Sequence, residues 1–162
     1  MAISQAVVFG LVALVGLSSF LTVMGVYQKS QAEYNYVLKV YRENVVDAAQ
    51  TSIHILSVTV SSNTLVLKVS NNGSTSLYEY GYFALVVDYY ANVSGSAVLV
   101  VSTYNYSPSP TAYEWTSLTG ELYPSGVGEF KVVLPYPPYA GKEASITLAT
   151  NYGPGAFWSG TL

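Results

Sequence analysis

The sequence of 162 residues contains no cysteine and a single histidine, His54. The absence of cysteine excludes disulfides, thiolate metal sites and thiol nucleophiles. Charged residues are also scarce, at 9% of the chain, whereas typical soluble proteins contain about 25%. The formal net charge is −3 and no basic patch is present, which argues against nucleic acid as a partner.

Sequence motifs of common catalytic centres are absent as well. The chain has no G-x-S-x-G, P-loop, G-x-G-x-x-G or zinc-ligand spacing. The carboxylates of Asp88, Glu114, Glu121 and Glu129 are scattered through predicted strands and loops, and we interpret them as solvated surface groups. His54 is interpreted as a half-exposed strand residue. We therefore expect no enzyme, and no catalytic, cofactor-binding or metal site.

The beginning of the chain is a long uncharged segment, because the first charged residue is Lys29. A secretory signal would have a basic start and an apolar core of only about 7–15 residues, and this segment has neither property. About 20 apolar residues suffice to cross the hydrocarbon of a membrane, and Ile3 to Tyr27 meets that length. The segment therefore predicts a membrane-spanning helix.

The helix is expected to continue past the apolar segment to about residue 50. Residues 29–50 lack proline and glycine, and apolar residues such as Leu38, Tyr41 and Val45 recur there at helical spacing. The basic residues Lys29 and Lys39 would mark this side as cytoplasmic by the positive-inside rule. Acidic residues accompany them, however, and the composition of the following region is typical of an extracellular domain, so we place that region outside.

The rest of the chain is predicted to be all β. Short runs rich in β-branched and aromatic residues are separated by Gly, Pro, Asn and Ser. We expect strands at 53–60, 64–69, 77–90, 97–104, 111–118, 129–134, 145–150 and 156–162. The run 77–90 is long for one strand, and Gly81 is expected to mark a bulge or bend in it. Alternation would place Tyr78, Tyr80 and Tyr82 on one sheet face.

These elements predict an α+β protein of two parts. Residues 1–50 form a long N-terminal hydrophobic α-helix, and residues 51–162 form an immunoglobulin-like β-sandwich head. Asn72, Asn92 and Asn105 each begin an N-x-[ST] sequon in or near a predicted loop, so they are glycosylation candidates. The 16 tyrosines are expected to serve both packing and surface contacts.

The whole chain resembles the archaeal type IV pilin and archaellin superfamily. Its beginning, AISQAVVFGLVALVGL, is similar to the mature N-termini of such subunits, with Gln5 near the position where bacterial pilins commonly have a Glu. The stretches KVSNNGSTSLYEY, YEWTSL, LYPSGVGEF and ITLATNYG resemble the β-sandwich heads of archaellum accessory (stator) proteins and archaellins.

This resemblance implies a structural subunit of an extracellular archaeal filament that acts in adhesion or motility. The helix would anchor the chain in the cytoplasmic membrane before assembly and would pack against copies of itself in a helical homopolymer afterwards. The apolar residues expected in that polymerisation core are Val7, Val8, Phe9, Leu11, Val12, Leu14, Val15, Leu17, Phe20, Leu21, Val23 and Met24. Surface-layer protein and host or neighbouring cell surfaces are further expected partners.

Two other functions remain open. The first is a membrane-anchored accessory protein of the archaellum, a stator whose head binds the surface layer while the helix stays in the membrane. The second is a membrane-anchored extracellular enzyme or solute-binding module, which would require Asp88 and a glutamate to lie together in a cleft. A filament subunit should be abundant and polymeric, whereas a stator should be scarce and membrane-bound.

Overall fold

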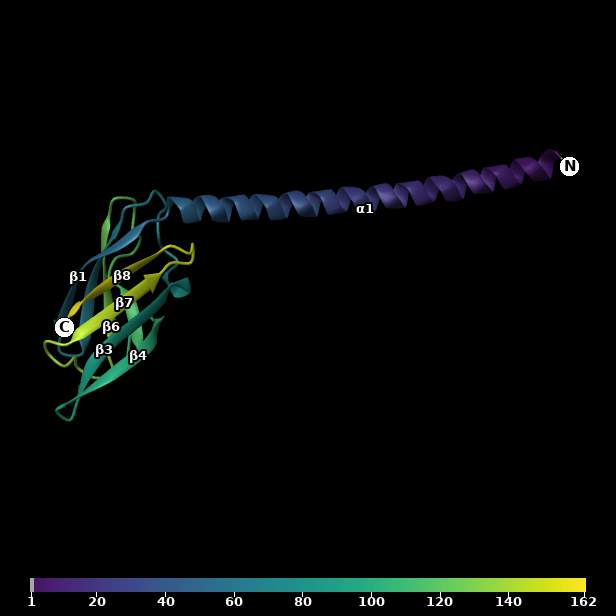
Figure 1. Ribbon diagram of the computed structural model, residues 1–162. Helices are drawn as coiled ribbons and strands as arrows, with labels where there is room; N and C mark the ends of the chain where they lie inside the picture. Colours follow the sequence, from purple (N-terminus) through teal and green to yellow (C-terminus); the bar gives the residue numbers. More distant parts are fainter. Residues whose placement is uncertain (1) are drawn as a thin grey trace. The chain divides into compact units, whose positions relative to one another are not determined.

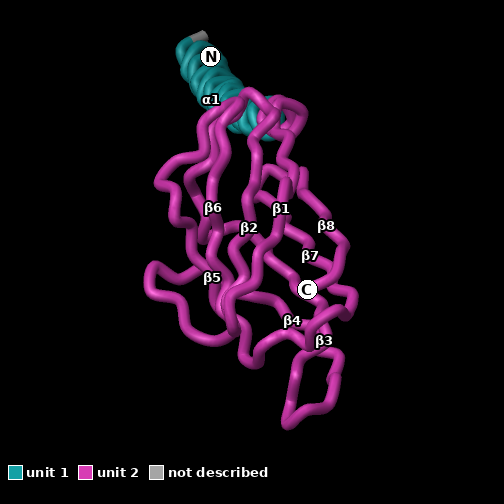
Figure 2. Tube along the Cα trace, turned by 90° about the vertical axis from the view of Figure 1, so that its left-hand side faces the viewer, with its two compact units in different colours: residues 1–44 teal, residues 45–162 magenta. Residues whose placement is uncertain are grey.

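A computed structural model describes residues 2–162, which divide into two compact units. The first unit ends at Asn44, and the second comprises Val45–Leu162 (Figure 2). The first unit is entirely helical, and the second contains the end of the helix and all of the β structure. Each unit is described here by itself.

The helix α1 covers Ala2–Gln50 without interruption (Figure 1). Its 49 residues correspond to roughly 70 Å at 1.5 Å per residue. The expected long N-terminal helix is therefore confirmed. No proline occurs in this range to remove a backbone donor, and its three glycines, at 10, 16 and 25, are isolated from one another.

Eight strands follow the helix (Figure 1). They are β1 (Ile53–Ser61), β2 (Thr64–Asn71), β3 (Ala84–Val93), β4 (Ser96–Tyr106), β5 (Glu114–Ser117), β6 (Val127–Val133), β7 (Glu143–Ala149) and β8 (Gly155–Thr161). A single 3-10 turn, η1 (Tyr80–Tyr82), lies between β2 and β3. The predicted β-sandwich is confirmed.

The strands form two antiparallel layers connected at one edge. One layer has the order β1-β2-β6-β5, and the other has the order β4-β3-β7-β8. A short parallel pairing joins them, in which Asn105 and Tyr106 of β4 lie beside Glu114 and Trp115 of β5. This pairing is parallel because residues 107–113 carry the chain back before β5 begins, so that β4 and β5 run in the same direction.

Alternating side chains of the two layers fill the core. In β2, Leu65, Leu67 and Val69 are fully buried, while Lys68 between them is exposed. The largest buried side chain is Trp115. Its ring lies 5.3 Å from that of Phe130 and 6.3 Å from that of Tyr80, measured between centroids. Aromatic pairs at these separations add to the stabilisation that burial provides.

The prediction for residues 77–90 is wrong in its first half. Leu77 makes only an isolated bridge to Leu122, and the chain then turns through η1 before β3 begins at Ala84. Tyr80 is buried, at 4% exposure, whereas Tyr82 is 76% exposed. The tyrosines at 78, 80 and 82 therefore do not share a sheet face. The turn allows the Tyr80 ring to pack edge-on against Phe130, at 5.4 Å between centroids.

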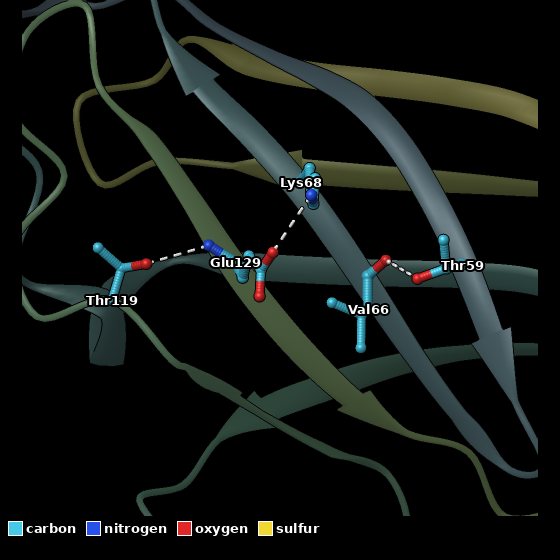
Figure 3. Close-up of polar contacts among 5 residues, drawn as sticks. All are labelled: Thr59, Val66, Lys68, Thr119 and Glu129. Carbon is cyan, nitrogen blue, oxygen red and sulfur yellow. Dashed lines mark hydrogen bonds and ion pairs between the residues drawn. The ribbon is translucent and has the colours of Figure 1, made fainter.

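The outer face of β2 and β6 carries an ion pair between the two strands (Figure 3). Lys68 and Glu129 are direct cross-strand partners, and the Lys68 Nζ lies 3.5 Å from a carboxylate oxygen of Glu129. Both side chains are about half exposed, so the ion pair contributes at most about 1 kcal/mol. The backbone N–H of Glu129 also donates to the Thr119 hydroxyl at 3.1 Å. This face is therefore suited to solvent.

Candidate functional site: the apolar helix and its junction with the β-sandwich

The residues predicted for the polymerisation core form a continuous apolar surface on α1. They include Val7, Leu14, Phe20 and Met24, and each of the twelve is at least 40% exposed in the single chain. The helix is long and apolar enough to cross a membrane by length and composition, and none of its most apolar window is buried. The surface is therefore free for lipid or for another helix.

Polar side chains within this segment are bonded to the helix itself. The Ser18 hydroxyl donates to the Val15 carbonyl at 2.9 Å, and the Thr22 hydroxyl donates to the Ser18 carbonyl at 2.9 Å. Such local bonds satisfy hydroxyl donors where no water is present. The helical backbone bonds are also internal, so the segment is suited to hydrocarbon.

Charged residues begin where the apolar segment ends. Lys29 lies 3.9 Å from Glu33, and Lys39 lies 3.8 Å from Glu43, both as i,i+4 pairs. All four side chains are at least 60% exposed. Exposed pairs of this kind contribute only a few tenths of a kcal/mol. These charged side chains require water. They therefore limit the apolar segment to the residues before Lys29.

The end of the helix is held by the strand-connecting loops of the second unit. The Thr51 hydroxyl donates to the Asp47 carbonyl at 2.7 Å, and the Ser74 backbone N–H donates to the Gln50 carbonyl at 2.8 Å. The last carbonyls of a helix have no partner within the helix. Here they receive donors from Thr51, which is 5% exposed, and from the loop after β2. The last helical residues, which belong to the second unit, are thereby bonded to the sandwich.

The loop after β2 continues this contact. The backbone N–H groups of Asn72 and Gly73 both donate to the Ser52 carbonyl, at 2.7 and 3.1 Å. A Cβ on Gly73 would lie 2.6 Å from the Ser52 nitrogen and closer still to the Gln50 carbonyl oxygen. Only glycine allows the loop backbone to approach the helix end this closely. The Asn72-Gly73 pair is therefore part of the junction.

The side chain of Asn71 is fully buried and forms hydrogen bonds with the loop after β2. Its side-chain Nδ2 donates to the Thr75 carbonyl at 2.7 Å and to the Leu122 carbonyl at 3.1 Å. Its Oδ1 accepts the Gly73 N–H at 3.0 Å. A buried amide is tolerated when both its donors and its acceptor are used. We name the set Asn71, Gly73, Ser74 and Thr51 the junction clamp.

Sequence reasoning missed the junction clamp. Asn71 lies between the predicted strands 64–69 and 77–90, where asparagine is common for local reasons. The pattern that could have indicated it is the run Asn71-Asn72-Gly73 directly after a buried strand. The partners, however, are distant in the chain: Ser74 bonds to Gln50, 24 residues earlier, and Asn71 bonds to Leu122, 51 residues later. The sequence gives no sign of such distant pairing.

The residues that could carry out acid–base chemistry are dispersed. His54 is exposed on β1. Hydrogen bonds from Thr111 lower the pKa of the exposed Glu114 carboxyl. Within residues 2–162, no group of three or more His, Asp or Glu side chains is placed to hold a metal ion.

One pair of carboxylates does share a hollow. Asp88 and Glu143 line a space of about 170 Å³ on the outer face of β3 and β7. The Ser145 hydroxyl donates to Asp88 Oδ2 at 3.1 Å and holds that carboxylate in place. Sites for small molecules usually measure about 300–1,000 Å³. The hollow is therefore smaller than the cleft that an enzyme or a solute-binding module would require.

The three sequon asparagines are all exposed. Asn72 lies in the loop of the junction clamp. Asn92 lies near the β3–β4 turn, where its Oδ1 accepts the Gly95 N–H at 3.0 Å. Asn105 lies in β4 where that strand pairs with β5. Their exposure is compatible with modification, and glycosylation at these positions stays a prediction.

The fold defines a class of protein in which a long apolar N-terminal helix is followed by an immunoglobulin-like β-sandwich. A family model described as the conserved flagellar protein F, immunoglobulin-like domain, matches residues 49–160. The chain belongs to this family. The match begins at the end of α1 and covers the strands β1 to β7 and all but the last residue of β8. None of the curated proteins compared with the chain matches it.

Solved structures with a similar fold come from the archaellum. The chain is 21% identical to the archaellum periplasmic stator protein FlaG of Sulfolobus acidocaldarius, over 68% of this chain and 99% of that one, with a TM-score of 0.55. It is 18% identical to a chain of the stator complex of FlaF and FlaG from the same organism, over 67% and 87%, with a TM-score of 0.54.

A third similar structure includes the helix. The archaeal flagellum of Methanospirillum hungatei strain JF1 matches with 16% identity and a TM-score of 0.54, over 94% of this chain and 93% of that one. At these identities the three likenesses concern the fold. The family match is the independent finding that makes the chain archaellum-related, whereas nothing in the comparisons points to type IV pilins specifically.

Proposed function

We propose that this protein is a membrane-anchored accessory subunit of the archaellum, with its β-sandwich outside the membrane and bound to the surface layer. The observation that carries this proposal is membership of the flagellar protein F family over residues 49–160. The expectation of a filament subunit becomes the second candidate. In the accessory function α1 stays in the membrane, and the sandwich provides the stationary contact outside it.

The helix and the junction clamp support a load-carrying function of this kind. An anchor must hold the chain against force, and an uncharged segment of more than 20 residues provides one. The force must then pass from the helix to the head. Bonds from Ser74 to Gln50 and from Thr51 to Asp47 connect the two directly. A flexible linker would let the head move without resistance, and no such linker is present between Gln50 and Ile53.

The second candidate is a structural subunit of the filament itself. The observation that favours it is the likeness to the archaeal flagellum, which extends over 94% of this chain and so includes the helix. In that function the twelve apolar residues from Val7 to Met24 would pack against helices of other copies. Burial at about 25 cal/mol per Å² of apolar surface would stabilise such a core.

The experiment that tests the proposal is co-sedimentation of the full chain with isolated surface layers. The chain is purified in detergent, reconstituted into vesicles and mixed with surface-layer sheets from the same cells. We expect the vesicles to sediment with the sheets and empty vesicles to remain in suspension. A strain that lacks the gene should also assemble filaments but swim poorly. Loss of the filaments themselves, with no surface-layer binding, would support the filament subunit instead.

A further inference from the structure

The hairpin of β3 and β4 carries one of the three sequons at its tip. Asn92 and Ser94, the first and last residues of this sequon, are both exposed. The hairpin extends beyond the strands around it (Figure 2). The Asn92 Oδ1 accepts the Gly95 N–H at 3.0 Å, which fixes the orientation of the side-chain amide. Its Nδ2 donates to no other group of residues 2–162, so the nitrogen that would receive a sugar is free.

An aromatic ring lies next to this asparagine on the same face of the sheet. Tyr90 precedes Asn92 by two residues in β3, and residues at this spacing share a face. Tyr90 is 36% exposed. Sugar rings carry C–H groups on their faces, and these groups pack against the face of an aromatic ring. A sugar on Asn92 would therefore lie within reach of the Tyr90 ring.

A hollow of about 410 Å³ opens beside this ring, and its volume is within the range of small-molecule sites. It is lined by Tyr90, Ala97, Gly141, Lys142 and Glu143. Ala97 is the direct cross-strand neighbour of the sequon asparagine. Lys142 and Glu143 are exposed and take part in none of the ion pairs within residues 2–162. The ammonium can donate to sugar hydroxyls and the carboxylate can accept from them.

The other two sequons lack these features. They end at Ser74 and Ser107, whose backbone N–H groups donate to the Gln50 and Trp115 carbonyls, both at 2.8 Å. Each of these sequons is thereby bonded to a different part of the chain, whereas Ser94 lies at a hairpin tip. Neither of them has an aromatic residue two positions before its asparagine. The hairpin sequon is therefore the one best suited to carry a sugar.

We propose that Asn92 carries an N-linked oligosaccharide whose first sugars lie in the hollow against Tyr90. The donor is a lipid-linked oligosaccharide phosphate. The bond from its anomeric carbon to the phosphate oxygen breaks, and that carbon bonds to the Asn92 Nδ2. The amide nitrogen loses one proton, and the lipid phosphate leaves. The proposal rests on the proposed function only in placing the head outside the membrane, which both candidate functions share.

Mass spectrometry of the full chain, purified from the cells that naturally produce it, tests the attachment. A protease that cuts after glutamate yields fragments 44–79 and 80–114, which separate the first sequon from the other two. Sequencing of fragment 80–114 should place the added sugar mass on Asn92. Ser94→Ala destroys the sequon but leaves Asn92 and Tyr90 in place, so it should remove that mass. The matched control Ser107→Ala, in the neighbouring sequon, should leave it unchanged.

Thermal unfolding tests the contact with the ring. The glycosylated parent should have a Tm about 5 °C higher than Ser94→Ala, because the covered ring stabilises the folded head. The same two chains produced in a bacterium that attaches no sugar give the effect of the substitution itself, which is subtracted. In a Tyr90→Ala background the remaining difference should disappear. In the control background Tyr82→Ala, at a tyrosine of η1 that is 76% exposed, it should persist.

Each outcome decides part of the proposal. Sugar on Asn92, together with a gain in Tm that requires Tyr90, supports it. An unmodified Asn92 in the natural chain overturns it. Sugar on Asn92 with equal gains in Tm in the Tyr90→Ala and Tyr82→Ala backgrounds overturns the placement in the hollow. Loss of surface-layer binding by a chain that still carries the sugar would contradict only the proposed function, so the two failures are distinguishable.

Discussion

Replacement of Asn71 by alanine tests whether the junction clamp stabilises the head. The Asn71→Ala change removes bonds of 2.7 Å to the Thr75 carbonyl, 3.1 Å to the Leu122 carbonyl and 3.0 Å from the Gly73 N–H. The last two groups keep other partners, because the Leu77 N–H also donates to Leu122 and the Gly73 N–H also donates to the Ser52 carbonyl. The Thr75 carbonyl loses its bond to Asn71 in a partly buried site.

The expected cost in the free energy of unfolding is about 2–4 kcal/mol, because a buried group left without a partner costs about 1–3 kcal/mol and the weakened bonds add to it. For a head of this size the corresponding fall in Tm is about 10–20 °C. Both tryptophans, Trp115 and Trp158, lie in the head. Tryptophan fluorescence of the full chain in detergent therefore reports unfolding of the head and not of the helix.

The matched control is Asn92→Ala. Asn92 also accepts a backbone N–H, from Gly95, but in an exposed turn, so its loss should cost less than about 1 kcal/mol. An Asn71→Asp variant separates hydrogen bonding from size. It keeps the acceptor for Gly73 but replaces the two donated bonds with a carboxylate that faces carbonyl oxygens, so it should be at least as unstable as Asn71→Ala. The reasoning is refuted if Asn71→Ala is no less stable than Asn92→Ala, or if Asn71→Asp matches the parent chain.

Three further predictions concern the span, the junction and the interior. Gly16→Asp places a charge near the middle of the apolar segment, which raises the free energy of membrane insertion by about 2.5–3.5 kcal/mol. Cell fractionation should therefore find less of this variant in the membranes. The control Ser30→Asp, which lies beyond the segment, should leave the amount in the membranes unchanged. Gly73→Ala should cost about 1–3 kcal/mol by overpacking and should increase protease cleavage near residues 50–52; unchanged cleavage would contradict the close approach. Burial raises the pKa of the Tyr104 phenol, so the folded state keeps a proton that the unfolded state releases near pH 10, and stability falls as pH rises above that value. Tyr104→Phe should flatten this alkaline loss in denaturation curves, and an equal flattening by Tyr82→Phe, at an exposed position, would disprove the assignment.

The helix and most strands could be predicted from the sequence because their patterns are local. The uncharged run before Lys29 indicates a helix for a membrane or a helical bundle, and the alternation of Leu65, Leu67 and Val69 indicates a half-buried strand. Both signals depend only on neighbours in the chain. The confirmed fold class therefore required no knowledge of distant contacts.

The errors lie where distant contacts decide the structure. Tyr78, Tyr80 and Tyr82 alternate like strand residues, but packing of Tyr80 against Trp115 and Phe130 favours a turn. Burial of one aromatic ring outweighs a strand propensity that spans about 1 kcal/mol. The bond from Asn71 to the Leu122 carbonyl was hidden for the same reason, because it joins residues 51 positions apart in the chain.

The residues predicted for the polymerisation core do not by themselves distinguish the two candidate functions. The twelve apolar residues from Val7 to Met24 are exposed on one helix, as an anchor or a polymer core would require, so the structure of the single chain is compatible with both. The family match favours the accessory subunit, which keeps these residues in lipid. What separates the two functions is the assembly in which the helix is found.

The measurement that tests the central claim most directly is quantitative mass spectrometry of two fractions from the same cells, sheared and purified archaella and the washed membranes. The account predicts that the chain is found in the membranes, in low copy number, and is at most a trace component of the filaments. Recovery of the chain as a major protein of the purified filaments would contradict it and would assign the apolar helix to the core of a polymer.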